Sequence, residues 1–453
     1  MDRILRRNAS YHVGTATACI TPEEPLWLAG YASRTSPARG IISDLYATAL
    51  ALEDEQGSRL VIASMDMIAI TPIIADPVVE TVRRRHGLSR EKILLSATHT
   101  HYGPEFRPDK KVFFRIPDDF AGKFAAVGER LTAALVEVID QAWNSLRPAR
   151  LFARSTTVGF AKNRRQASIQ GKSIVPAAVD HDVNVLECVG EDGRRKAIVF
   201  GYACHNTTIP PDDLRYCGDW AGFAKEQLHR DNPEATVLFL PGAGADQEPE
   251  PRGSVELSRQ HGLQMAHAVQ ETLKWPGEEL IGPLSVNSEE IILPLEPVTQ
   301  ASISRMLKSD DPPQQVKARY LAEMQARGEA LITSYSAPIQ IVRFGNRLLL
   351  IALSGEPVVD WAHKFKDTLS KRRGFPPTAA SEGIELLETG PTVWVAGYCN
   401  DMFGYLPTRR VQTEGGYEGG RAALWSWIPA PFADGVEECV MDAVLRLVNR
   451  ASK

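Results

Sequence analysis

The sequence predicts an α/β fold. Short apolar runs rich in Val, Ile and Leu alternate along the chain with longer stretches in which apolar residues recur at helical spacing. Such alternation favours a sheet with helices packed against it. The runs that we expect to form strands are Leu60–Ser64, Lys92–Ala97, Ala197–Ala203, Thr236–Leu240, Arg347–Leu353 and Thr392–Ala396.

Four stretches carry the periodicity of helices. They are Asp118–Leu146, Asp219–Arg230, Leu257–Lys274 and Asp434–Val448. In the first of them, apolar residues recur every three or four positions, which predicts a helix with one buried face. The residues of this stripe are Phe120, Phe124, Val127, Leu131, Leu135, Val138 and Ala142.

The order of these elements favours a single domain. The chain has 453 residues, a length that fits one large domain or two smaller ones. A polar helical segment begins at Ser309–Pro313, but expected strands resume after it. We therefore expect one domain over residues 1–453, with a polar helical excursion near residues 300–335.

Composition excludes several classes of function. The net charge is −5 and both signs are dispersed, which argues against nucleic-acid binding. No window approaches 18 consecutive apolar residues, so we expect no membrane insertion. The charged N-terminus is not followed by the apolar stretch of a signal peptide, and the six cysteines lack CxxC spacing. These features favour a cytoplasmic protein with a small-molecule substrate, and leave a homo-oligomer open.

Polar side chains gather where the expected strands end. The segments that follow five of the strands are Thr98–Pro104, Cys204–Asn206, Gly242–Gln247, Ser354–Pro357 and Gly397–Asp401. In open α/β sheets, ligands bind at the carboxyl ends of strands. Because these segments carry His, Asp, Glu and Asn, we expect them to line one cleft.

This mixture of side chains suits a catalytic metal. A zinc ion takes about three nitrogen or oxygen ligands and leaves one position open for water, whose pKa falls to about 7. The His99-Thr100-His101 spacing alone is weak evidence, because such pairs also occur without a metal. The alternative is that one histidine satisfies buried backbone while the other is solvated. Asp66, Asp219 and Asp246 are candidates for orienting a ligand histidine from behind.

Several motifs, in the same order along the chain, resemble those of the neutral (non-lysosomal) ceramidases. The central one is Ser96-Ala97-Thr98-His99-Thr100-His101-Tyr102-Gly103-Pro104, which looks like the metal-binding signature of that family. The others are Gly30–Ala32, Gly40–Ile41, Leu45–Ala47, Asn163–Arg164, Cys204–Thr208, Gly218–Gly222, Ser354–Pro357, Gly397–Asn400, Gly404–Tyr405 and Tyr417–Gly420. The resemblance implies a mixed sheet core flanked by helices and a zinc-dependent hydrolase domain.

The resemblance also implies roles for single residues. The positions that match the zinc ligands of the family are His99, His205, Glu356 and Tyr405. His101 matches a histidine that faces the metal-bound water or the substrate. Arg164 and Tyr417 match groups that stabilise the oxyanion of the tetrahedral intermediate, where aimed donors are worth several kcal/mol.

Two departures from the family pattern bear on the reaction. Where the ceramidases have Gly-Asp-Val-Ser-Pro, this chain has Ala245-Asp246-Gln247-Glu248-Pro249, with Glu248 at the position of the serine. Asp246 and Glu248 are therefore catalytic candidates, Glu248 as general base or acid, with substrate binding or a structural carboxylate as alternatives. The chain also stops where the ceramidases continue into a C-terminal β-sandwich, so we expect the fold without that sandwich.

These considerations predict a zinc-dependent hydrolase that cleaves an amide bond of a soluble N-acyl compound through a zinc-bound hydroxide. The first alternative is a true ceramidase that acts on N-acyl sphingoid lipids. The second is an inactive ceramidase-like ligand-binding protein, and a third is a metal-dependent amidohydrolase barrel. In such a barrel the HxH pair ends the first strand, whereas here at least two expected strands precede His99. Trp425 and Trp427 follow the last motif closely and are expected to wall the pocket.

Overall fold

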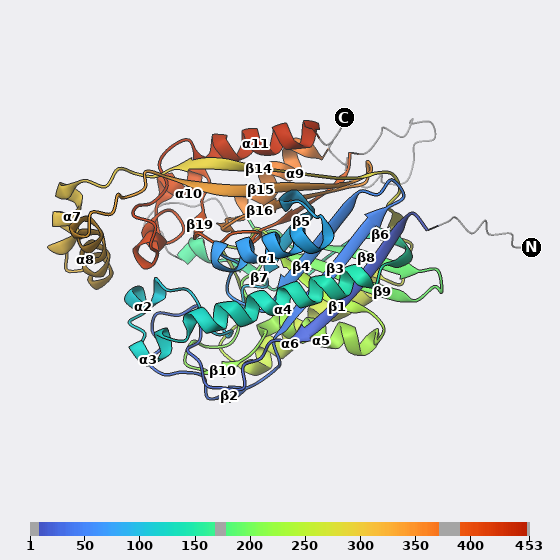
Figure 1. Ribbon diagram of the computed structural model, residues 1–453, viewed down its shortest axis with the longest axis horizontal. Coiled ribbons are helices and arrows are strands. Elements are labelled where there is room, and N and C mark those ends of the chain that lie inside the picture. The colour runs from blue at the N-terminus through green and yellow to red at the C-terminus, as the bar shows by residue number, and fades with distance from the viewer. Residues whose placement is uncertain (1–8, 168–177, 371–389, 451–453) are drawn as a thin grey trace, which may run out of the picture.

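The computed structural model describes residues 9–167, 178–370 and 390–450. In this part of the chain, two β-sheets form the centre of the molecule and helices cover their outer faces (Figure 1). The architecture is mixed α/β, which confirms the expected fold class. Residues 1–8, which begin the N-terminus that we expected to lack a secretion signal, lie outside the described residues.

The larger sheet has nine strands among the described residues. Their order is β11-β9-β8-β6-β1-β3-β4-β5, and β13 pairs with β6 beside this path. Their bounds are β1 Tyr11–Cys19, β3 Tyr46–Asp54, β4 Arg59–Met65, β5 Ile93–Ala97, β6 Arg147–Thr157, β8 Asp182–Gly190, β9 Arg195–Tyr202, β11 Thr236–Pro241 and β13 Glu278–Glu279. Neighbouring strands are antiparallel except at β4/β5 and β9/β11, which are parallel.

The smaller sheet has the order β14-β15-β16-β18, in which β16 and β18 are parallel. The strands are β14 Leu284–Pro294, β15 Ser334–Phe344, β16 Leu348–Leu353 and β18 Thr392–Ala396. Three two-stranded ladders join loops: β2 Gly40–Ile41 with β10 Arg215–Tyr216, β7 Ala161–Asn163 with β12 Gln247–Pro249, and β17 Glu356–Pro357 with β19 Tyr405–Leu406.

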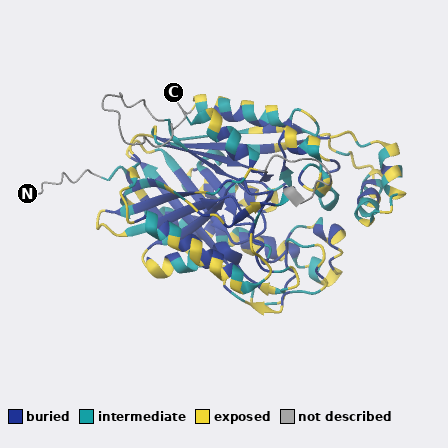
Figure 2. Ribbon diagram, turned by 180° about the vertical axis from the view of Figure 1, so that it is seen from behind, coloured by how far each residue is buried: buried dark blue, intermediate teal, exposed yellow. Residues whose placement is uncertain are grey.

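Apolar burial on both faces of each sheet holds the layers together. Between the sheets, Leu50 and Ile62 of the larger one share a buried cluster with Leu350 and Trp394 of the smaller one. The outer face of the larger sheet is covered by α1 Pro72–His86 and α4 Phe124–Asn144 on one half. It is covered by α5 Asp219–Asp231 and α6 Val255–Thr272 on the other half. The outer face of the smaller sheet packs on α9 Asp360–Leu369 and α11 Val436–Arg450. Figure 2 shows the result, with buried strands inside and helices exposed on their outer sides.

The expected strands and helices are present, but one helix is interrupted. The stretch Asp118–Leu146 divides into a short α3 at Asp118–Ala121 and the long α4, which begins at Phe124. Gly122 lies at the break, where a glycine lowers helix stability by about 1 kcal/mol relative to alanine. The single continuous helix that we expected there is wrong, whereas the buried stripe from Phe124 to Ala142 is confirmed.

The polar segment near residues 300–335 forms two helices, α7 Gln300–Leu307 and α8 Pro312–Ala326. Thr299 and Ser302 form a capping box at the start of α7, which explains where this helix begins. The pair projects from the body of the molecule in Figure 1. The remaining short helices are η1 Arg90–Lys92, α2 Lys110–Phe113, η2 Arg164–Ala167, α10 Arg409–Glu414 and η3 Arg421–Trp425.

Two further features concern membrane-spanning helices and cysteines. In the described part of the chain, the helices are too short or too polar to cross a lipid bilayer. All six cysteines lie among the described residues as free thiols.

Candidate metal centre and active site

The site lies where parallel strands end. β5 and β9 run into loops that carry His99 and His205, and the turn after β16 leads to Glu356 at the start of β17. A bridge between Thr100 and Asn206 joins the first two loops. The register of β17 and β19 places Glu356 directly beside Tyr405. The structure therefore brings together the four residues that the resemblance named as ligands.

His99 is held in a strained turn directly after β5. Its backbone has φ +60°, a left-handed conformation that is uncommon for residues other than glycine and is enriched at functional sites. Its Nδ1–H donates to the carbonyl of Ile68 at 2.7 Å. A carbonyl only accepts, so this bond fixes the tautomer and leaves the lone pair on Nε2.

His205 is fixed in the same way. Its Nδ1–H donates to the carbonyl of Gly244 at 2.8 Å, and its Nε2 is buried without a hydrogen-bond partner among the described residues. Burial lowers the pKa of His205 to about 4, so the imidazole is neutral at physiological pH. A neutral histidine whose second nitrogen is tied to backbone is the usual form of a metal ligand.

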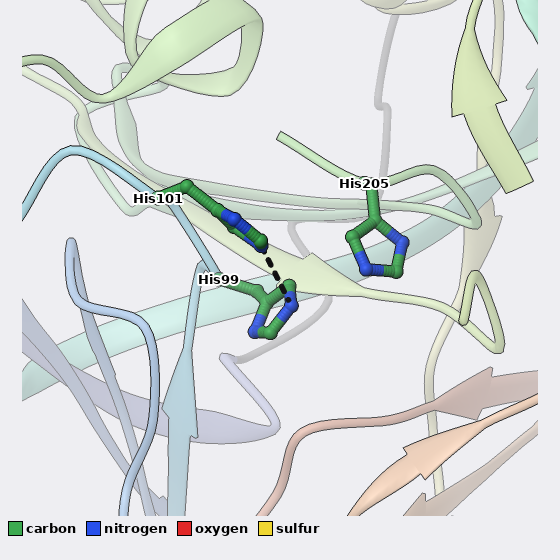
Figure 3. Close-up of side chains that lie close together, drawn as sticks. All are labelled: His99, His101 and His205. Atoms are coloured by element: carbon green, nitrogen blue, oxygen red, sulfur yellow. Dashed lines mark hydrogen bonds between the residues drawn. The ribbon is translucent and has the colours of Figure 1, made fainter. Parts of the chain in front are cut away.

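His101 completes a group of three imidazoles. Its Nε2 lies 3.3 Å from Nε2 of His99 (Figure 3), and one nitrogen of each of His99, His101 and His205 falls within 4.8 Å of the others. The ring of His101 packs on Tyr31 with centroids 4.7 Å apart. Gly30 makes this packing possible, because a Cβ there would meet the His101 ring at 2.5 Å.

Glu356 points a carboxylate oxygen at two of these imidazoles. Its Oε2 lies 3.3 Å from Nε2 of His99 and 3.4 Å from Nε2 of His205. Burial raises the pKa of Glu356, whereas positive charge on the imidazoles of His99 and His205, when either is protonated, holds it well below its usual range. The side chain is therefore ionised.

The donor set fits a metal ion. With both Nδ1 atoms committed to carbonyls, the Nε2 lone pairs and the carboxylate oxygen are all acceptors, and acceptors that face one another repel unless a cation lies between them. Nitrogen and carboxylate donors in this number suit zinc. The geometry thus supports a metal site at these residues.

Arg164 contacts Tyr405, the fourth candidate ligand. Its Nη2 donates to the hydroxyl of Tyr405 at 3.0 Å and its Nε to Glu418 at 2.8 Å. The guanidinium also stacks over the rings of Tyr405 and Tyr417, which lie 5.3 Å apart. The two residues expected to stabilise an oxyanion, Arg164 and Tyr417, are therefore neighbours beside a candidate metal ligand.

Asp246 supports this group from behind. Its backbone carbonyl accepts from the Arg164 amide at 2.8 Å, and its carboxylate accepts from Asn163 at 3.0 Å and from the Val359 amide at 2.8 Å. Asp246 is fully buried, and burial raises its pKa to about 6. These bonds fix the segments that carry Arg164 and Glu356, so Asp246 positions the site rather than facing it.

Glu248 is placed differently from the other candidates. It lies in β12, and its carboxylate pairs with Arg252 at 3.0 Å. It is absent from the lining of the large cavity described below. Its catalytic role therefore stays a prediction.

We expect Glu248→Gln to lower kcat/KM by less than about tenfold, because a neutral amide can replace a carboxylate that only pairs with Arg252 near the surface. The matched control is Arg252→Gln, which removes the partner of the same pair. Steady-state kinetics on any cleaved amide checks this. A loss of a hundredfold or more in Glu248→Gln alone, with KM unchanged, would instead identify Glu248 as the general base.

The groups that orient the histidines are not those that the sequence suggested. The carboxylate of Asp66 binds Lys225 and the amide of Tyr46, and the carboxylate of Asp219 accepts from Ile209, Trp220 and Ser258. The orienting groups are the backbone carbonyls of Ile68 and Gly244. Because every residue has a backbone carbonyl, the sequence does not indicate which of them bind the histidines. Glu418 was also missed, although it follows Tyr417 directly.

A cavity of about 810 Å³ opens onto the site. Its lining includes His99, His101, Glu356 and Tyr405, and also both tryptophans that the sequence suggested, Trp425 and Trp427. A volume in this range accommodates a small organic molecule.

Comparison with known proteins identifies the family. Residues 11–239, about half of the chain, match the family described as neutral/alkaline non-lysosomal ceramidase, N-terminal. The chain belongs to this family.

Two relatives illustrate the extent of the similarity. The chain is 26% identical to a neutral ceramidase of Drosophila pseudoobscura over 252 residues, which are 52% of this chain and 34% of that protein. It is 24% identical to a neutral ceramidase of Pseudomonas aeruginosa over 93% of this chain and 70% of that protein. The match thus spans about a third of the length of the Drosophila relative.

The fold agrees with a solved structure. The crystal structure of the Pseudomonas aeruginosa neutral ceramidase superposes with a TM-score of 0.73 at 21% identity, covering 98% of this chain and 75% of the other. At this identity the match shows a shared fold.

Proposed function

We propose that this chain is a zinc-dependent hydrolase that cleaves the amide bond of an N-acyl compound. The observation that carries the proposal is the convergence of the buried Nε2 atoms of His99 and His205 on one carboxylate oxygen of Glu356. When bound, zinc supplies a Lewis acid that polarises a carbonyl and makes water nucleophilic at neutral pH.

The residues around these ligands have complementary tasks in amide hydrolysis. Arg164 and Tyr417 donate to the carbonyl oxygen as it becomes an oxyanion, and removing such a donor typically costs about 2.7–4 kcal/mol. Glu418 and Tyr405 hold the Arg164 guanidinium before substrate binds. His101 lines the cavity as a neutral imidazole, because burial holds its pKa well below its usual value. In the proposed reaction it accepts a proton from water and delivers it to the leaving amine.

The nucleophile in this proposal is water rather than a serine. Glu248 stands where the motif of the resembled family has its serine, so this chain offers no hydroxyl at that position. The proposed reaction therefore proceeds without an acyl-enzyme.

The proposed substrate is a soluble N-acyl compound with a polar or aromatic part. Trp425 and Trp427 offer flat faces for stacking, and the same cavity is also lined by the polar residues Lys110 and Asp401. Ceramide is the second candidate, because the relatives are named neutral ceramidases. A ligand-binding protein without activity is less well supported, since the complete donor set is present.

Kinetics on two kinds of substrate test the proposal. The panel contains water-soluble N-acyl amino acids, N-acyl amino sugars and aryl amides, compared with a long-chain ceramide in mixed micelles. We expect the best soluble compound to have the higher kcat/KM. A tenfold preference for ceramide, about 1.4 kcal/mol of transition-state binding, would assign the lipid instead, and no hydrolysis of either kind would contradict the proposal.

A further inference from the structure

Two buried lysines from separate helices hold one segment of the cavity wall. Nζ of Lys317 in α8 donates to the carbonyls of Ser426 and Ile428, each at 2.5 Å. Nζ of Lys110 in α2 donates to the carbonyl of Trp425 at 2.7 Å. Three carbonyls of the short segment 425–428 thus receive their hydrogen bonds from lysine side chains.

The burial of Lys317 is unusual for a lysine. Its side chain is 2% exposed, and it forms no ion pair within the residues that the structure describes. Burial lowers the pKa of Lys317 to about 7. Burying an amine is unfavourable unless its N–H groups are bonded, and here the bonds go to backbone of the wall. The ring of Phe113, 5.3 Å from Nζ, provides the other contact.

The wall segment depends on these bonds for its position. It begins at the last residue of η3 and has little further secondary structure of its own. The backbone amide of Ser426 donates to the carbonyl of Ala423, and that of Ile428 to the Ser426 side chain, each at 3.3 Å. Without the lysines, the carbonyls of Ser426 and Ile428 would lose their donors in a buried setting, which disfavours the present conformation.

Two further contacts join α8 to η3 and the wall segment. Arg421 at the start of η3 pairs with Asp311 at the start of α8, with Nη1 and Oδ2 2.8 Å apart. Val316 and Tyr320 of α8 pack in one apolar cluster with Trp425. The helical excursion, which projects from the body in Figure 1, is thus joined to the cavity through one face of α8.

The segment that the lysines hold is also a surface of the cavity. Trp425, Ser426, Trp427 and Ile428 line it, together with Tyr320 and Lys110. The candidate metal ligands instead come from the loops after β5 and β9 and from β17 and β19. Movement of the wall would therefore change which molecules fit in the cavity, while the candidate metal ligands would keep their positions.

We propose that Lys317, assisted by Lys110, is a specificity-determining positioning residue that fixes the Trp425–Ile428 wall against the helical excursion. The wall selects substrates by the bulk of the group that extends from the scissile amide toward it. Selection among amide substrates rests on the proposed function. The positioning of the wall by Lys317 does not.

The test uses Lys317→Met, which removes the hydrogen-bond donor but keeps a side chain of similar length. It is compared with Lys317→Arg, which keeps a donor, and with the control Arg319→Met. Arg319 is on the same helix, is exposed, and donates to Gln315. Hydrogen exchange of residues 421–430 is measured first. We expect exchange there to be at least tenfold faster in Lys317→Met than in the natural protein, and unchanged in Arg319→Met, with zinc content equal in both.

Kinetics then separate binding from chemistry. In Lys317→Met we expect KM to rise at least tenfold for an amide with a bulky aromatic group. For the smallest cleaved amide, we expect both kcat and KM to stay within twofold of the natural values. Lys317→Arg should restore part of the exchange protection, because it keeps a donor.

The outcomes are distinguishable from a failure of the proposed function. Equal exchange of residues 421–430 in Lys317→Met and the natural protein overturns the wall proposal, whatever the activity. A uniform change across all substrates also overturns it as a specificity device. If Lys317→Met does not fold, Lys110→Met and the surface variant Asp311→Asn are judged by the same exchange criterion.

Discussion

Replacing His205 by alanine is expected to remove the metal ion and lower kcat/KM by at least about 10³-fold, or about 4 kcal/mol. The reason is that Nε2 of His205 is buried, faces Glu356 and lacks a hydrogen-bond partner among the described residues, which is what ligation of a metal ion explains. Elemental analysis should find about one zinc per chain in the natural protein and much less in the variant.

The matched control for this change is His267→Ala. His267 is exposed on α6, 4.0 Å from Glu271, and lies outside the cavity lining. It should keep zinc and activity. Thermal unfolding adds a check on folding, because a ligand that binds only the native state raises the melting temperature. Zinc should raise the melting temperature of the natural protein and the control, and leave that of His205→Ala unchanged. A His205→Ala protein with its full zinc content would show that the ligand assignment is wrong.

Replacing Arg164 by methionine is expected to lower kcat about 10²–10³-fold while zinc content stays near one per chain. The guanidinium bonds the hydroxyl of Tyr405 and lies over Tyr417, and in the proposed reaction its loss removes a donor to the oxyanion. The measurement is kcat and KM together with metal content, since an effect on the transition state lowers kcat more than it raises KM.

Glu418→Gln provides the comparison for Arg164. Its carboxylate binds Arg164 at 2.8 Å and Arg165 at 2.9 Å, so the change weakens the hold on the guanidinium without deleting it. We expect a smaller loss of kcat than in Arg164→Met. If Arg164→Met loses its zinc, Arg164 supports the metal through Tyr405, and the oxyanion role would be contradicted.

Sequence alone predicted the strands that carry the site, and the reason is physical. β4, β5, β9, β11 and β16 are buried almost throughout, so they appear as continuous apolar runs that end in polar residues. The strands whose neighbours are all antiparallel, such as β1 and β14, were not predicted. β14 includes Asn287, Glu289 and Glu290, and β1 alternates Thr and Ala, so neither has the composition of a buried run.

The sequence named candidate residues of the site but did not predict how they are arranged in space. Motif resemblance named Glu356 and Tyr405, but their contact depends on a ladder of two residues per strand, whose register no pattern encodes. The left-handed backbone of His99 is likewise imposed by the surrounding fold. Asp66 shows why the partner of a side chain could not be predicted. A carboxylate at a strand end can bind either a histidine or a lysine, and in the structure Asp66 binds Lys225.

Zinc reconstitution tests the central claim most directly. The purified protein is stripped with a chelator, dialysed, and titrated with zinc while hydrolysis of the best amide of the panel is followed. The account predicts that activity disappears on stripping, rises in proportion to added zinc, and reaches a plateau at about one equivalent per chain. Activity that survives complete removal of metal would contradict it.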